Sequence, residues 1–404
     1  MVNPVTLQFL ALAVFLLAPA ITGEAVVQNS DRSNLLDEIT TEELIRLMKD
    51  DTCVLVDTRD SNAFNGWRLD GVARGGHIPG AINFSAAWLD IKVADRDETF
   101  QATLKEKGIT GEKRIVLYDS DDRDREKIAF FLQSQGITGI SSYDLRLWIN
   151  DQKLQLEKYP NFQFLVPPQI ANQLINGQRP ETFEKATTVK FAEVSWGDES
   201  KSYDLGHIPG SFHINTDSVE PPPKWMLASD EELARFALAH GFVHTDTVIL
   251  CGEDQMAAFR VAVILRYIGV QDVRVLNGGL AAWKAAGMKL ETDRREPVPS
   301  IEFGAAIPAR PELIDTYREV LEGLKNRERF TLVDNRTWEE HIGEISGYSY
   351  HFKKGRVPGA RFGHSGKTGA SSLGYYRNVD GTLRSADELQ SLWQQSGINT
   401  NTHL

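Results

Sequence analysis

Short apolar runs and amphipathic stretches alternate along most of the chain, and this alternation predicts strands and helices in turn. Residues 115–117 and 248–250 are apolar throughout and too short for helices, as expected of strands buried inside a parallel sheet. Before the second run, residues 229–241 carry apolar side chains at helical spacing, open with a capping box of Ser229 and Glu232, and end in glycine. The pattern predicts an α/β fold with helices on both faces of each sheet.

The same pattern is written more than once, which predicts a tandem repeat. Three related segments, GHIPGA, GHIPGS and GRVPGA, begin at Gly76, Gly206 and Gly355. Each follows an apolar run that marks a preceding strand, at residues 54–59, 189–194 and 332–336. We therefore expect three similar domains separated by proline-rich linkers, at residues 35–160, 168–295 and 308–404.

The turn after the central strand is where open α/β sheets place their chemistry. This turn begins eleven positions after a helix-ending glycine in both of the first two copies, at Asp119 and at Gly252. The same count from Gly397 passes Leu404, the last residue of the sequence. We therefore expect the third copy to be incomplete and to lack its active-site turn.

Together these segments resemble the rhodanese family of sulfurtransferases. The likeness rests on the strand ending in D-x-R at residues 57–59, the GHIPGA segment, the strand-turn-helix loop, and LNGGLAAW at 276–283. It covers nearly all of residues 35–404 and is similar to periplasmic thiosulfate sulfurtransferases with three rhodanese domains. The resemblance implies tandem rhodanese-like α/β domains, each a parallel sheet with helices on both faces.

The resemblance also implies a reaction and its partners. Sulfane sulfur would pass from thiosulfate to a thiophilic acceptor, cyanide or a thiol, through a cysteine persulfide in two half-reactions. No metal or organic cofactor is implied. A sulfur-carrier protein is a further expected partner.

The sequence holds two cysteines, Cys53 and Cys251, which fall in different predicted cores and are too few for a disulfide framework or a thiolate zinc site. The family's catalytic position carries Asp119 in the first copy, which we expect to be silent, and Gly252 in the second. Cys251 stands one position earlier, and a shift of one residue at a strand end turns a side chain to the opposite face. Cys251 is therefore either a packed strand-end residue or the nucleophile. The predicted site is Cys251 with four substrate-binding residues, Gly252, Glu253, Asp254 and Arg260.

Other chemistry-bearing residues have simpler interpretations. Cys53 precedes a buried strand and is expected to be a packed side chain, and His77 and His207 are expected to be hydrogen-bonded turn residues. The acidic cluster at residues 119–124 lacks the glycine of a calcium loop and is expected to be a solvated turn. Residues 366–368 read GKT, but Arg361 stands where a phosphate loop needs its first glycine.

Composition and charge narrow the partners. Lysine and arginine number 44 against 56 acidic residues, for a formal charge of -12, which disfavours nucleic acid. Residues 5–20 are mostly apolar and uncharged and end in an A-x-A pattern, which predicts a signal peptide over residues 1–25. The run is short for a membrane span, although an uncleaved anchor is the alternative. We expect a periplasmic protein that is not integral to a membrane.

A second function from another class stays open at this point. The alternative is a non-catalytic rhodanese-fold scaffold or sulfur-carrier-binding protein, a truncated relative of the enzyme. The position of the Cys251 thiol separates this interpretation from the sulfurtransferase.

Overall fold

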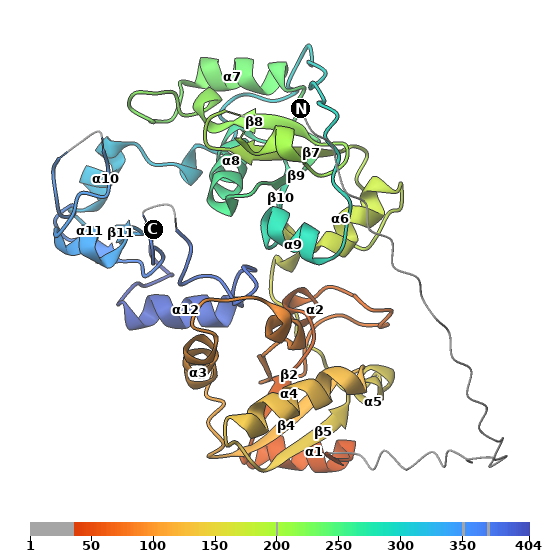
Figure 1. The fold of residues 1–404 in the computed structure, drawn as a ribbon. Helices are drawn as coiled ribbons and strands as arrows, with labels where there is room; N and C mark the ends of the chain where they lie inside the picture. Colours follow the sequence, from red (N-terminus) through yellow and green to blue (C-terminus); the bar gives the residue numbers. More distant parts are fainter. Residues whose placement is uncertain (1–35, 199–200, 350–351, 370–371) are drawn as a thin grey trace, which may run out of the picture. The chain divides into compact units, whose positions relative to one another are not determined.

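The computed structural model describes residues 36–198, 201–349, 352–369 and 372–404 (Figure 1). The signal peptide predicted at residues 1–25 lies outside the described residues. Within those ranges, no helix combines the length and the apolar character needed to cross a bilayer.

The first sheet has five strands, all paired in parallel, in the order β1-β5-β4-β2-β3. Its strands are β1 (Asp37–Glu38), β2 (Cys53–Asp57), β3 (Ile82–Asn83), β4 (Arg114–Asp119) and β5 (Ile140–Asp144). Its helices are α1 (Thr41–Lys49), α2 (Ser61–Asn65), α3 (Arg96–Glu106), α4 (Asp122–Ser134) and α5 (Leu145–Asn150).

The second sheet repeats this topology, in the order β6-β10-β9-β7-β8, again entirely parallel. Its strands are β6 (Leu165–Val166), β7 (Val189–Ser195), β8 (Phe212–Asn215), β9 (Thr247–Cys251) and β10 (Asp272–Leu276). Its helices are α6 (Pro168–Ile175), α7 (Asp230–Ala239), α8 (Gln255–Ile268) and α9 (Gly279–Ala285). The predicted α/β fold with tandem parallel sheets is confirmed.

Alternate residues of the central strand β4 feed two separate cores. Ile115 and Leu117 pack with Ile128 of α4, whereas Val116 and Tyr118 pack with α5 on the other face. In the second sheet, residues 248 and 250 of β9 pack with α8, and residues 249 and 251 pack with α6 and α9. The strands are buried on both faces, which explains why their sequences are apolar throughout rather than alternating.

An arginine ties the end of β2 to the GHIPGA segment. Arg59 donates two hydrogen bonds to the Asp57 carboxylate, at 2.9 and 2.5 Å, and one to the carbonyl oxygen of Gly76, at 2.7 Å. All three groups are buried, so the guanidinium and carboxylate neutralise each other away from water.

The third segment contains a parallel pair, β11 (Val333–Asp334) and β12 (Arg361–Phe362), and the helices α10 (Tyr317–Gly323), α11 (Trp338–Ile342) and α12 (Ala386–Gln395). Arg336 donates two hydrogen bonds to Asp334, at 2.9 and 2.8 Å, and one to the carbonyl oxygen of Gly355, at 2.9 Å. This arrangement repeats the one around Arg59, so the third segment shares local geometry with the first copy.

Candidate functional site

The loops that follow β4 and β9 lie at the carboxyl edge of each sheet, directly before α4 and α8. Pairing within the sheets sets their correspondence, because Asp57 lies opposite Tyr118 in the first copy and Glu193 lies opposite Cys251 in the second. Cys251 is therefore the counterpart of Tyr118, and the next residue along each chain marks the start of the loop.

In the first copy the loop position is filled by a buried carboxylate. Asp119 is 3% exposed and accepts hydrogen bonds from the Thr58 hydroxyl, at 2.8 Å, and from the backbone N–H of Asp121, at 3.0 Å. Burial, and then the negative charge of Asp57, raises the pKa of Asp119 to about 6. The expectation of a solvated acidic turn is wrong for Asp119, because its carboxylate is held inside the loop by the protein's own donors.

In the second copy Cys251 lies in the core. Its side chain is 1% exposed and packs in the cluster that includes Ile249 and Trp283, and its Sγ lies 3.7 Å from the carbonyl oxygen of Ala192. Burial, followed by the charge of Glu193, raises the pKa of the thiol well above its ordinary value. A thiolate is the reactive form of cysteine, and this environment disfavours it.

The next position has no room for a side chain. A Cβ at Gly252 would lie 2.4 Å from the carbonyl oxygen of Val194, closer than real carbon and oxygen atoms approach. The carbonyl oxygen of Gly252 also accepts a hydrogen bond from the Leu280 N–H at 3.1 Å. The loop is therefore fixed against β7 and α9 without a nucleophile at its start.

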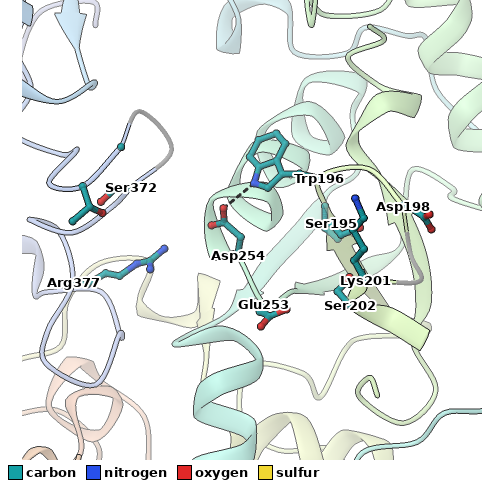
Figure 2. Close-up of a pocket in the computed structure, with 12 residues that line it drawn as sticks. Ser195, Trp196, Asp198, Lys201, Ser202, Glu253, Asp254, Ser372 and Arg377 are labelled. Carbon is teal, nitrogen blue, oxygen red and sulfur yellow. Dashed lines mark hydrogen bonds between the residues drawn. The ribbon is translucent and has the colours of Figure 1, made fainter. Parts of the chain in front are cut away.

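Beside this loop lies a cavity of about 560 Å³, which we call the Trp196 cavity. Six of its lining residues carry the argument: Trp196, Lys201, Glu253, Asp254, Ser372 and Arg377. Figure 2 shows the first four coming from the second copy, with Ser372 and Arg377 opposite them. Asp198 also lines it, so the cavity presents an indole, three carboxylates and two cations, Lys201 from the second copy and Arg377 from the third segment.

Asp254 holds the indole side of this cavity in place. One carboxylate oxygen accepts a hydrogen bond from the Met256 N–H at 2.9 Å and so caps α8, and the other accepts from the indole N–H of Trp196 at 2.8 Å (Figure 2). The same carboxylate therefore caps the helix and orients the indole.

Of the predicted binding residues, Glu253 and Asp254 line the Trp196 cavity, but Arg260 does not. Arg260 lies on α8 and forms an ion pair with Glu220, with its Nε 2.9 Å from a carboxylate oxygen. A substrate-binding role for Arg260 therefore stays a prediction, since its guanidinium pairs with Glu220 and lies outside the Trp196 cavity.

Trp196, Lys201 and Arg377 line the cavity but were not predicted as site residues from the sequence. Trp196 directly follows β7, whose carboxyl end meets that of β9 at the same edge, so the parallel topology was the available signal. Arg377 belongs to the third segment, and no local pattern connects it to this cavity.

Both turn histidines are buried and hydrogen-bonded through Nδ1. His77 pairs with the carbonyl oxygen of Phe64 at 2.8 Å, and His207 with that of Tyr203 at 2.9 Å. In each copy the histidine backbone also exchanges two hydrogen bonds with a glutamate after the sheet, Glu157 in the first. The expectation of hydrogen-bonded turn residues is confirmed.

Comparison with known proteins decides the family. The profile of the rhodanese-like domain matches residues 40–145 and 187–286. The thiosulfate sulfurtransferase YnjE of Escherichia coli is 39% identical over 344 residues, covering 85% of this chain and 77% of that protein. The chain belongs to the rhodanese family. A second rhodanese-family relative, the sulfur carrier protein TtuD of Thermus thermophilus, is 35% identical over 206 residues, covering 48% of this chain and 68% of that protein.

Solved structures extend the likeness of this rhodanese chain across its third segment. The wild-type structure of EanB superposes with a TM-score of 0.85 at 34% identity, covering 92% of this chain and 88% of that one. The anaerobic ergothioneine biosynthesis enzyme of Chlorobium limicola, in complex with trimethyl histidine, superposes with a TM-score of 0.84 at 33% identity, covering 91% and 88%. Relatives of this chain therefore include proteins named for transfer of sulfur from thiosulfate and for ergothioneine synthesis.

Proposed function

We propose that this chain promotes transfer of the outer sulfur of thiosulfate to a thiophilic acceptor, cyanide or a thiol. The observation that carries the proposal is the 39% identity to a thiosulfate sulfurtransferase over 77% of that protein's length. A sulfur-carrier protein is an acceptor of the same chemistry, since one relative bears that name.

The sulfur step itself is a nucleophilic displacement. The acceptor's electron pair, on cyanide carbon or thiolate sulfur, forms a bond to the outer sulfur of thiosulfate. The sulfur–sulfur bond breaks, and its electron pair leaves with sulfite. The products are thiocyanate or a persulfide of the acceptor thiol, together with sulfite, and the step needs no outside oxidant or reductant.

Neither cysteine of the chain suits the covalent version of this reaction. Cys251 is packed in a core, and Cys53 lies at the amino end of β2, at the opposite edge of its sheet from the loop that precedes α4. Burial raises the pKa of the Cys53 thiol, which also disfavours its thiolate. We infer that neither sulfur carries a persulfide and that the acceptor attacks bound thiosulfate directly.

The Trp196 cavity is the proposed acceptor site. It opens at the carboxyl edge of the second sheet, and Lys201 and Arg377 lie among its three carboxylates. These two cations are the proposed contacts of an anionic nucleophile. Reaction without a covalent intermediate requires donor and acceptor to be bound together, which a cavity lined from two segments of the chain can provide.

A second acceptor class is favoured by the same cavity and by the solved relatives. Structures of EanB hold hercynine or ergothioneine, and that enzyme is described with a cysteine persulfide. In the Trp196 cavity, the indole with Glu253 and Asp254 would attract a trimethylammonium group, and Arg377 would pair with a carboxylate. Trimethyl histidine therefore belongs among the acceptors to be tested.

The test is to measure initial rates of thiocyanate formation by the full chain with thiosulfate and cyanide. The measurement is then repeated with trimethyl histidine as acceptor. We expect intersecting double-reciprocal lines, since both substrates must be bound at once, and equal turnover for the wild type and Cys251→Ala. Parallel lines together with inactive Cys251→Ala would overturn the direct-transfer proposal. No turnover with any acceptor would instead favour the non-catalytic scaffold.

A further inference from the structure

A second, smaller cavity lies beside the carboxyl end of α3, where Lys107 pairs with Glu388 of α12. We call it the α3 cavity, and its volume is about 200 Å³. The lining residues that matter are Trp88, Glu106, Lys107, Lys367, Arg377 and Arg384. Four of these six side chains are cationic and one is anionic, so the cavity has a strong excess of positive charge.

Two of the four cations are already neutralised. Lys107 donates to the Glu388 carboxylate at 2.5 Å, with the lysine side chain 5% exposed. Arg384 donates two hydrogen bonds to Glu106, at 2.5 and 3.0 Å. These pairs fix the wall of the cavity, and they leave its charge balance to the other two cations.

Lys367 and Arg377 have no such partner. Among the residues that the structure describes, no carboxylate forms an ion pair with either side chain. Arg377 is half-buried, and burial lowers the pKa of its guanidinium, against the charge of Asp254, which raises it. Lys367 is exposed, and its Nζ lies 5.9 Å from the centroid of the Tyr375 ring. The half-buried Arg377 cation has lost hydration that an anion in the cavity would replace.

Two N–H donors at this cavity also lack acceptors. The indole N–H of Trp88 and the Nε–H of Arg377 are buried and have no hydrogen-bond partner within the described ranges. Trp88 is fully buried and lines the cavity together with Arg377. Leaving a buried donor unsatisfied is unfavourable, whereas an oxygen-rich anion accepts from several donors at once.

We propose that the α3 cavity binds a small dianionic oxyanion, with Lys367 and Arg377 as its counter-charges. The two cations that form no ion pair among the described residues match the charge of a dianion, and the cavity volume of about 200 Å³ admits a small oxyanion. Thiosulfate, or the sulfite released from it, is the dianion expected here, and this assignment of the ligand rests on the proposed function. Because Arg377 also lines the Trp196 cavity, a donor bound here would lie next to the proposed acceptor.

The test is calorimetric titration of the full chain with thiosulfate, sulfate and phosphate at constant ionic strength, without any acceptor. We expect Arg377→Met and Lys367→Met each to weaken thiosulfate binding roughly 10- to 100-fold. Arg377→Lys should retain part of the affinity. Lys325→Met removes an exposed lysine that pairs with Glu322 in the same segment, and it should bind as the wild type does.

Wild-type affinity in Arg377→Met, with circular dichroism confirming that the variant is folded, would overturn the proposal. An equal response to chloride at matched ionic strength would overturn it as well. Tighter binding of thiosulfate than of sulfate and phosphate supports a donor site, and equal binding of all three supports a general oxyanion site. Since no acceptor is present, a chain that binds oxyanion without turnover would contradict the proposed function and leave the binding site standing.

Discussion

One buried residue distinguishes the electrostatics of the second copy from those of the first. Asp57 is neutralised by Arg59, whereas Glu193 lies at the same register and has Ser195 where the arginine would stand. Neither carboxylate oxygen of Glu193 has a hydrogen-bond partner of good geometry among the described residues. Burial raises the pKa of Glu193 to about 7, so the fully buried acid keeps a proton well above its ordinary range.

Glu193→Gln should therefore stabilise the chain at pH 8 by roughly 1–3 kcal/mol and have little effect near pH 4. Between the ordinary pKa of 4.5 and about 7, the folded chain holds a proton that the unfolded chain has lost. Wild-type stability therefore falls as the pH rises through that window. Urea unfolding at the two pH values measures the difference.

Asp57→Asn is the matched control for this experiment. It breaks the buried pair with Arg59 and leaves a guanidinium without its counter-charge, so it should lower the free energy of unfolding at pH 8. A Glu193→Gln protein that is less stable than the wild type at pH 8 would show that the carboxylate has a partner we have not identified.

At the scale of elements, what the sequence predicted well was local. The capping box of Ser229 and Glu232, the strand β9 after it, and the helix that ends before Gly241 all depend on neighbouring residues, and all are present. The one-residue shift at the end of β9 also indicated that Cys251 turns toward a core, because side chains alternate along a strand.

The cavities were beyond sequence reasoning for a physical reason. Arg377 and Trp88 line one cavity because the third segment packs against the first copy. Tertiary packing of this kind leaves no period or spacing in the sequence. The burial of Asp119 was not predicted for a related reason, since its carboxylate is bound by Thr58, which follows β2 and is distant in the sequence.

The two loops predict opposite outcomes when a cysteine is introduced. Asp119→Cys places a thiol where the native carboxylate is 3% exposed and where burial and the charge of Asp57 raise its pKa, so the thiol should be alkylated by iodoacetamide more slowly than Cys53, in a protein that stays stable. Gly252→Cys forces its Cβ against the carbonyl oxygen of Val194 and should lower the free energy of unfolding by about 1–3 kcal/mol without giving a fast thiol.

Alkylation rates by mass spectrometry, and urea unfolding of both variants, measure these effects. A fast-reacting thiol in a stable Gly252→Cys protein would mean that the loop of the second copy can accept a nucleophile. A thiol in Asp119→Cys that reacts faster than Cys53 would mean that the first loop favours an anion despite the charge of Asp57.

At the scale of the whole molecule, the third segment completes sites that begin in the other two copies. Two ion pairs join it to the first copy, Lys107 with Glu388 and Arg384 with Glu106. The Leu383 N–H donates to Asn277 of the second copy at 2.9 Å. Both cavities share Arg377, so loss of its guanidinium should affect donor and acceptor binding together. Under the proposed function, sulfur transfer depends on surfaces built by several segments and on no cysteine among the described residues.

The most direct test of this claim is the intact mass of the full chain after incubation with thiosulfate alone, followed by removal of excess reagent under non-reducing conditions. We expect an unchanged mass for the wild type and for Cys251→Ala. When cyanide is then added together with fresh thiosulfate, the two proteins should form thiocyanate equally. A gain of one sulfur atom in the wild type that is absent from Cys251→Ala would contradict it.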